Sequence, residues 1–334
     1  MPRNHNTPAR ELETLATLVP ELRADRSIDE TEGLERRLKT LLLQALRPPV
    51  SAATARRIAE LQNAIGFIPK FKSYSIKASL PLGYSVFLHN EREGFSFQQH
   101  TSHKVEVFHI LEAMPGAYVF LCPYPEWQKV YDPSRFGAWM NGEADPALDC
   151  FRFTPRPGDV FRIDQLGIVH TVIGCILEEF ANTSTDMVDR LHDQNAGRRI
   201  PPSFSREYME ERIASIVLPE ESCHVLSDGT RVPLDVERFE GGHLTTISPA
   251  PLVALRGTLE PHGSTPTWQH PEVAATLHIW AGSGELVLGD EAPLPVTPNS
   301  VFLIPPTVPY RLVNGGESPL QWSEQRLPLE QAFV

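Results

Sequence analysis

Hydrophobic residues recur at helical spacing in the first part of the chain. Between residues 9 and 66, leucines stand three and four positions apart with charges between them, as in RELETLATLVPELRAD and ETEGLERRLKTLLLQAL. This period places the leucines on one face of a helix. Pro48 and Pro49 end the second stretch, and Ser51 is positioned to cap a third helix, AATARRIAELQNAIGF. We predict helices here that pack against the rest of the protein or form a subunit contact.

From Lys70 onward the pattern changes to short runs of β-branched and aromatic residues. Examples are SYSIKASL, YSVFLHN, VEVFHIL and AYVFLCP, separated by Pro, Gly, Asn and Asp. Short strands with frequent turn residues are typical of an antiparallel barrel or sandwich. A charged helical stretch at about residues 205–218 interrupts the pattern, and a second β-rich block follows from about residue 222. The sequence therefore predicts a mainly β fold with an N-terminal helical extension.

The two β-rich blocks resemble copies of one design. VEVFHILEAMPGAYVFL in the first parallels ATLHIWAGSGELVLG in the second, and PGDVFRIDQLGIVHTV parallels TPNSVFLIPPTVPYRLV. Such self-similarity indicates a duplicated unit, and a chain of 334 residues has room for two. We predict a helical extension at residues 1–69, a first barrel at 70–200, a helical linker at 201–221 and a second barrel at 222–334.

Composition and charge narrow the range of partners. The chain is 41% hydrophobic, so a sizeable core can form, and its formal net charge of −12 argues against nucleic acid or an anionic membrane as the main partner. The four cysteines are far apart and lack CxxC spacing, which favours reduced thiols over a disulfide framework. The sequence shows neither a signal peptide nor a membrane-spanning run. These features predict a soluble cytoplasmic protein.

Polar residues gather inside one strand-like stretch of the first block, FSFQQHTSHKVEVFHIL. They are Gln98, His100, His103, Lys104 and Glu106. The segment PGDVFRIDQLGIVHTV supplies one further histidine, His170. Imidazole suits zinc, iron, nickel and copper, and a carboxylate offsets the charge of a divalent ion. On two strands that a barrel brings face to face, these side chains predict a metal site.

Strand geometry orders these candidate ligands. Residues two apart share a face of a strand, so Gln98 and His100 point the same way, and Glu106 can join them after the turn-like TSH segment. His103 is out of that parity unless a bulge re-aims it. The metal ligands are therefore drawn from Gln98, His100, His103, Glu106 and His170. Three or four of them with one open position would make the site catalytic.

The second block lacks the same set of polar residues. The positions that correspond to Glu106 and His170 hold neither a carboxylate nor a histidine. His262, His270 and His278 are present, but no carboxylate stands at the right spacing from them. We interpret the second barrel as a degenerate copy that supports the fold or a homodimer.

The polar positions of the first block resemble the two motifs of the cupin superfamily, whose members fold as small jelly-roll barrels. The first motif is followed in order, with HxxH in place of HxH, by Gly94, His100, His103, Glu106 and Gly116. The second motif, PGD followed by a turn and a histidine, is matched by Pro157, Gly158, Asp159 and His170. The resemblance implies duplicated cupin jelly-roll barrels from about residue 70 onward.

Within the cupins, the local pattern is similar to sugar isomerases. Mannose-6-phosphate isomerases and related bacterial sugar cupins carry a stretch like LSLQxHxHRxE, and here it reads FSFQQHTSHKVE with one inserted residue. D-lyxose isomerases are similar in carrying Lys-x-Glu, which Lys104 and Glu106 match. The resemblance implies a metal-dependent aldose–ketose isomerase acting on a sugar or sugar phosphate. Zinc is the expected metal, with manganese, nickel or iron as alternatives.

The resemblance also suggests catalytic roles. Lys104 is the candidate to move a proton between the two carbons or between their oxygens, and Glu178 or Glu179 is a candidate by its position near the late strand. Arg190 is the candidate to hold a phosphate or a developing oxyanion through its planar fork. The ordinary interpretations are a lysine at the barrel rim and an arginine in a surface ion pair.

Residues 123–149 lie between the two motifs and look like a long loop over the barrel mouth. Trp127, Tyr131 and Trp139 would stack on sugar faces there. Arg152, Arg156 and Arg162 follow directly and are candidates to meet a phosphate.

Two other functions stay open. Two histidines and a carboxylate with open positions also suit a non-haem iron dioxygenase. A barrel without metal would be a non-catalytic sugar-binding protein. Gln98 as a ligand favours the isomerase, whereas a strict set of two histidines and one carboxylate favours the dioxygenase.

Overall fold

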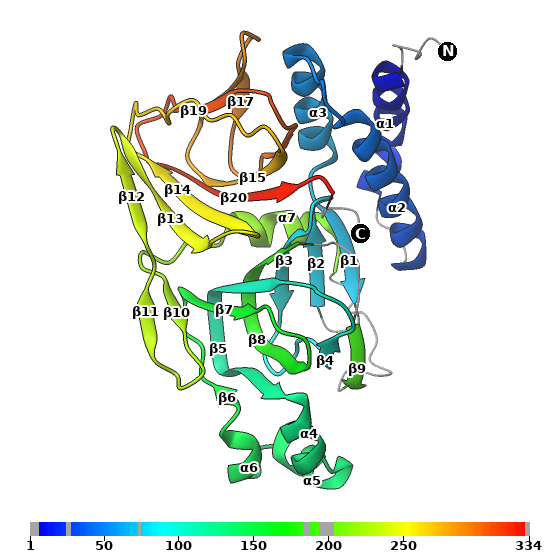
Figure 1. Ribbon diagram of the computed structural model, residues 1–334, viewed down its shortest axis with the longest axis vertical. Coiled ribbons are helices and arrows are strands. Elements are labelled where there is room, and N and C mark those ends of the chain that lie inside the picture. The colour runs from blue at the N-terminus through cyan, green and yellow to red at the C-terminus, as the bar shows by residue number, and fades with distance from the viewer. Residues whose placement is uncertain (1–6, 25–27, 73–74, 183–187, 194–203, 331–334) are drawn as a thin grey trace.

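The structure is a computed structural model that describes residues 7–24, 28–72, 75–182, 188–193 and 204–330. It consists of two β-barrels, one above the other in Figure 1, with helices along one side of the upper barrel. The predicted mainly β architecture with an N-terminal helical extension is confirmed. No helix within these ranges is both long and apolar enough to cross a membrane.

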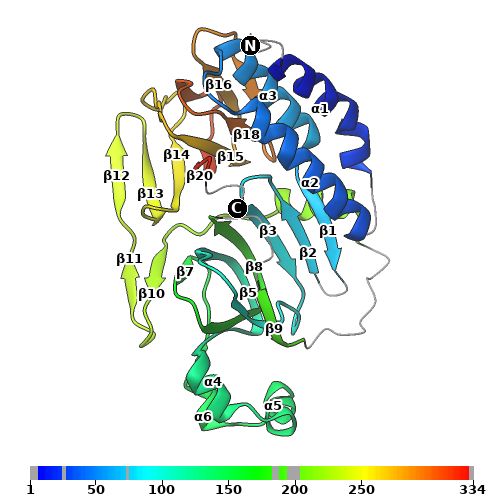
Figure 2. The ribbon, with the colours of Figure 1, turned by 45° about the vertical axis from the view of Figure 1, so that its right-hand side comes forward.

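Three helices open the described chain, namely α1 (Thr7–Arg23), α2 (Ile28–Ala45) and α3 (Ala52–Ile65). Ser51 caps α3 as expected, because its side chain accepts the Thr54 N–H at 3.1 Å. Ala55 and Ala59 on this helix are buried in the apolar core of the second barrel. The helical extension therefore packs against the second barrel (Figure 2), and the homodimer stays a prediction.

The first barrel contains most of one sheet. Its strands are β1 (Ile68–Lys72), β2 (Ser75–Ser79), β3 (Tyr84–His89), β4 (Phe97–His100), β5 (Glu106–Pro123), β6 (Arg152–Phe153), β7 (Asp159–Ile163), β8 (Ile168–Ala181) and β9 (Val188–His192). The long strand β8 lies between β3 and β5, and β4 joins its first residues by pairing Gln98 with His170. Phenylalanines such as Phe87, Phe95 and Phe108 fill the interior.

The first sheet continues past the predicted boundary at residue 222. After α7 (Arg206–Ala214), the strands β10 (Cys223–Val225) and β11 (Arg231–Pro233) extend this sheet, because β10 pairs parallel with β7. Arg231 fixes the arrangement with a two-point ion pair, in which its Nε and Nη2 each lie 2.7 Å from an oxygen of Asp159. Parallel strands need a long connection, so β7 and β10 lie far apart in the sequence, and no local pattern predicts their pairing.

The second barrel is built from two smaller sheets. Its strands are β12 (Val236–Phe239), β13 (Gly242–Ser248), β14 (Val253–Leu259), β15 (Val273–Ala281), β16 (Gly284–Leu288), β17 (Leu294–Val296), β18 (Val301–Ile304), β19 (Tyr310–Asn314) and β20 (Leu320–Pro328). β15 pairs with β18 as β5 pairs with β7 in the first barrel. Segments with parallel sequences thus occupy equivalent places, as expected for a duplicated unit.

The segment between the two motifs is helical, which corrects the predicted loop over the barrel mouth. It forms α4 (Tyr124–Val130), α5 (Pro133–Met140) and α6 (Pro146–Asp149), and it projects from the lower end of the first barrel in Figure 1. Trp127 and Trp139 are each 3% exposed and pack with Phe97 and Phe120. These rings form a small core of their own, because covering them from water stabilises the segment more than displaying them to a sugar would.

A buried polar network joins the two barrels. Glu178 of β8 accepts hydrogen bonds from the Tyr84 hydroxyl at 2.6 Å and from Trp280 Nε1 of the second barrel at 3.3 Å. Its other oxygen lies 2.9 Å from His109 Nδ1. The Tyr84 hydroxyl also lies 2.9 Å from His278 Nδ1 across the boundary. His109 therefore belongs to this buried network and not to the group of residues predicted to bind a metal.

Gly257 of β14 allows Trp322 of β20 to lie flat inside the second barrel. A Cβ added at Gly257 would stand 2.0 Å from Trp322 Cζ2. Gly257→Ala should therefore lower the free energy of unfolding by about 1–3 kcal/mol, as overpacked cores do. Urea unfolding measures the change. Gly137→Ala in α5 is the control, since its Cβ would meet nothing within 4 Å. Equal stability of both variants would contradict the packing described.

Candidate metal centre

Three side chains from three strands converge inside the first barrel. His100 ends β4, Glu106 begins β5 and His170 lies near the start of β8. Glu106 Oε2 lies 3.0 Å from His100 Nε2 and 3.5 Å from His170 Nε2. Their ligand atoms all lie within 4.8 Å of one another, and among the described residues this is the one group of its kind. Each residue is at most 4% exposed.

Backbone contacts orient both imidazole rings for ligation. His100 Nδ1 donates to the Lys104 carbonyl oxygen at 3.1 Å, and His170 Nδ1 donates to that of Ile168 at 3.0 Å. Each Nδ1 carries a proton, so in a neutral ring Nε2 is an acceptor. Two acceptor nitrogens and a carboxylate oxygen thus face one another, and a cation between them satisfies all three. This donor set fits a divalent metal, with the outer nitrogens held as in known metal sites.

Lys104 pairs with the second oxygen of Glu106. Burial alone would lower the pKa of Lys104, but the carboxylates of Glu106 and Glu179 outweigh it and raise that pKa. Burial would raise the pKa of Glu106, whereas the Lys104 ammonium group and the adjacent imidazoles of His100 and His170 hold that pKa well below its usual range. Glu106 is therefore a carboxylate and Lys104 an ammonium group at neutral pH.

The structure separates the five predicted ligands into two groups. His100, Glu106 and His170 come together, whereas His103 is exposed and lies outside the cluster. His103 follows a bend at Thr101 and Ser102, in the segment between β4 and β5, and by spacing it is out of phase with the other candidate ligands. Gln98 stands beside the cluster, half-buried, with its Nε2 3.4 Å from His170 Nε2.

The predicted catalytic residues lie at different distances from the surface. Glu179 is 5% exposed and points into the first barrel, because it pairs with Phe108 of the interior. Arg190 of β9 is exposed, and it pairs with Gln98 on the neighbouring strand β4. Paired residues share a face of the sheet, so Arg190 lies on the same side as Gln98 and His170. The candidate metal centre is therefore buried on the side of the barrel core, and its nearest route to solvent lies on the side of β9.

Sequence reasoning missed Lys77 of β2. Its Nζ lies 3.5 Å from Glu179 Oε1 and 5.0 Å from the centroid of the Phe87 ring. The first barrel therefore holds a buried series of alternating charges, in the order Lys77, Glu179, Lys104 and Glu106. The signal available for it was a charged residue inside the otherwise uncharged, strand-like stretch SYSIKASL.

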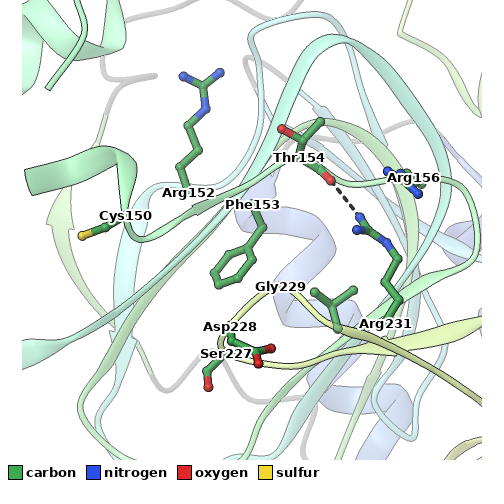
Figure 3. Close-up of a pocket in the computed structure, with 10 residues that line it drawn as sticks. Cys150, Arg152, Phe153, Thr154, Arg156, Ser227, Asp228, Gly229 and Arg231 are labelled. Carbon is green, nitrogen blue, oxygen red and sulfur yellow. Dashed lines mark hydrogen bonds between the residues drawn. The ribbon is translucent and has the colours of Figure 1, made fainter. Parts of the chain in front are cut away.

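The arginines expected to meet a phosphate line a different region. Arg152 and Arg156 line a pocket of about 410 Å³ between β6 and the β10–β11 hairpin. Figure 3 shows Arg152 pointing away from Ser227 and Asp228; its guanidinium lies over the Tyr118 ring at 4.7 Å. Arg152 pairs with Phe120 of β5, whereas His170 pairs with the next residue, Leu121. Neighbouring residues of a strand point to opposite faces, so Arg152 and His170 lie on opposite faces of the sheet.

Arg162 also has partners away from the cluster. Its Nε donates to Asp164 at 2.9 Å, and its Nη1 donates to the Ser248 hydroxyl of the second barrel. None of these three arginines faces the candidate metal centre. Of the arginines predicted to bind a phosphate, only Arg190 lies on the side of the sheet that carries the cluster.

Comparison with known proteins agrees with the cupin resemblance at the level of the fold. A family model described as "Cupin domain" matches residues 255–325, which run from β14 to β20 in the second barrel. No curated protein matches the chain. The motifs that suggested cupins lie in the first barrel, whereas the family match lies in the second, so the two observations are independent.

Solved structures give distant likenesses over most of the chain. Oxalate decarboxylase from Bacillus subtilis is 12% identical, with 78% of this chain and 73% of that chain covered and a TM-score of 0.47. The 11S globulin from Wrightia tinctoria is 14% identical, with 79% and 82% covered and a TM-score of 0.47. The first is an enzyme and the second a globulin, and no activity follows from likenesses this distant. The family match supports a cupin fold for the second barrel.

Proposed function

We propose that the first barrel is a metal-dependent aldose–ketose isomerase acting on a sugar or sugar phosphate. One observation carries the proposal. A cluster that fits a divalent metal lies beside a buried ammonium group, Lys104, and a buried carboxylate, Glu179. Isomerisation needs this combination, since the carbonyl must be polarised while protons move between neighbouring atoms.

The metal would be held by His100, Glu106 and His170, with Gln98 close enough to complete the set. Zinc is our first candidate, and manganese, nickel and iron suit the same ligands. When bound, a divalent cation supplies Lewis-acid polarisation of the substrate carbonyl. Lys104 holds the second oxygen of Glu106, which keeps that carboxylate oriented toward the two imidazoles.

The protein's own residues would carry the proton transfers. Glu179 would take the proton from the carbon beside the carbonyl and return it to the former carbonyl carbon. Lys104 would donate a proton to the carbonyl oxygen and recover one from the neighbouring hydroxyl. The raised pKa of Lys104, which Glu106 and Glu179 cause against its burial, keeps it in the donating form. Arg190, at the solvent side, would bind the phosphate of a phosphorylated substrate.

A dioxygenase is the second candidate, because the converging set is two histidines and one carboxylate. That composition suits non-haem iron with open positions for oxygen. Gln98 and the Lys104–Glu179 pair favour the isomerase, since oxygen insertion does not require a buried acid and base beside the ligands. Oxygen consumption by the iron-loaded protein distinguishes the two functions.

Lys104→Ala, assayed with metal in excess so that the centre stays loaded, should lower the isomerisation rate by ~10²–10⁴-fold, because a general acid is lost while the three ligands remain. The measurement is turnover of a panel of pentose and hexose phosphates in deuterated water. Exchange at Glu179 should leave deuterium on the carbon beside the carbonyl. Lys129→Ala is the control, since Lys129 lies exposed on α4 and pairs with Glu126. No turnover of any sugar by the wild type, with oxygen consumed on another substrate, would replace the isomerase by the dioxygenase.

A further inference from the structure

A polar cavity lies between the two barrels, separate from the candidate metal centre. The cavity, of about 440 Å³, lies between the segment 218–223 and the outer face of β13, β14 and β20. Figures 1 and 2 show the β10–β11 hairpin and the strands β12–β14 following one another along this side of the molecule. Cavities of this size accommodate small organic ligands. We propose that it binds a small hydroxylated organic anion, whose carboxylate or phosphate is held by Arg256.

Strand register explains why the cavity wall is polar. Thr245 pairs with Arg256, His243 pairs with Thr258, and Thr258 pairs with Gln321. Paired residues point to the same face, so all five side chains line one surface, and all of them line the cavity. The residues between them, such as Leu244 and Leu255, are buried in the apolar core of the second barrel. The sheet is therefore apolar inside the barrel and polar toward the cavity.

Arg256 is the cation of this surface. It is 8% exposed, and its hydrogen bond is from Nη2 to the Pro219 carbonyl oxygen at 2.9 Å. Burial lowers the pKa of Arg256 to about 10. The charge of Glu178 acts to raise the pKa of Arg256, although the two side chains do not form an ion pair. Glu178 already accepts hydrogen bonds from Tyr84 and Trp280. A guanidinium has five N–H donors, and the hydrogen bond to Pro219 uses one of them.

A buried cation with unused donors is unfavourable until an anion or ordered water satisfies it. A carboxylate or phosphate fits the planar fork with two parallel hydrogen bonds. The hydroxyls of Thr245 and Thr258 and the amide of Gln321 suit the hydroxyl groups of a polar ligand. Glu220 and Glu221 also line the cavity but are exposed, so they lie at its rim and disfavour highly charged anions.

Calorimetric titration of the whole protein with D-gluconate and with glycerol 3-phosphate tests this site. Xylitol serves as the uncharged comparison. One of the two anions should bind, which tells a carboxylate site from a phosphate site, and xylitol should not. Arg256→Gln should weaken binding by roughly 10-fold or more, because a charge-assisted hydrogen bond is lost. Arg311→Gln removes a positive charge from an exposed position on β19 of the same barrel and should leave binding unchanged.

Two further variants keep the test decisive. Thr258→Val removes a hydroxyl from the cavity wall and should weaken binding even if Arg256→Gln does not fold. Glu106→Gln alters the candidate metal centre and should leave binding intact, so failure of the proposed isomerase would not affect this result. The site is wrong if neither anion binds at millimolar concentration, if Arg256→Gln and Thr258→Val both bind like the wild type, or if Glu106→Gln abolishes binding.

Discussion

Replacing Glu106 by Gln, or His170 by Ala, should abolish stoichiometric metal binding while the first barrel stays folded. Each change removes one of three converging ligands, and loss even of an outer-shell partner typically lowers metal affinity 10–100-fold. The fold should persist because Phe87, Phe95 and Phe108 supply the apolar interior. Elemental analysis of protein purified without a polyhistidine tag measures the metal, and circular dichroism measures the fold.

His103→Ala is the matched control for these ligand variants. His103 belongs to the same HxxH segment as His100 but is exposed and outside the cluster. It should therefore keep the wild-type metal content. Metal retained by both ligand variants, or lost from His103→Ala alone, would show that the three converging residues are not the ligands.

Replacing Glu178 by Ala should destabilise the junction between the barrels by about 3–5 kcal/mol, as removal of one partner from a buried charged network does. Tyr84, His109 and Trp280 would each lose a buried acceptor. Urea unfolding measures the change. Glu112→Ala on β5 is the control, because its ion pair with Arg212 is about one-third exposed and such pairs contribute at most about 1 kcal/mol. Equal losses in both variants would show that the network does not hold the barrels together.

The same network should make the protein sensitive to acid. Hydrogen bonds from His109 and Tyr84 outweigh burial and lower the pKa of Glu178 to about 2, so its stabilisation is present above its ordinary value of 4.5 and is lost as pH falls toward 2. Burial lowers the pKa of His278 to about 4, so that residue adds stability above pH 6.5 that is lost as pH falls toward 4. Unfolding free energy should decline from pH 6.5 downward, and Glu178→Gln should remove the lower part of that decline. A stability that is flat from pH 7 to 3 would contradict both assignments.

The residues of the candidate site were foreseeable because strand parity is a local property. Gln98 and His100 share a face, Glu106 rejoins them, and His103 falls out of phase, all of which the spacing indicates. The partner strand was foreseeable too, since the second cupin motif, PGD followed by a turn and a histidine, points to His170. Sequence spacing alone does not decide whether the inserted residue forms a bulge, so it does not exclude His103 from the ligands; the exposure of His103 does.

Features that depend on distant pairing were not foreseeable. Glu178 and Glu179 are adjacent and chemically alike, yet Glu178 faces the second barrel and Glu179 the interior of the first. Which one turns inward depends on the register of β8 against β3 and β5, and a shift by one residue would exchange them. The short helices α4–α6 were not predicted, because their aromatic residues do not follow a helical period in the sequence. These residues are buried against one another instead.

The position of β20 has a consequence for how the protein is made. This strand lies between β14 and β15 and pairs with both, although it follows them in the chain. During synthesis β14 and β15 emerge first, each with an edge of unpaired N–H and C=O groups where β20 will lie. The first barrel has all of β1–β9 by then and can close early. The second barrel thus keeps two open strand edges until β20 emerges, whereas β8 fills the equivalent gap between β3 and β5 of the first barrel earlier in synthesis.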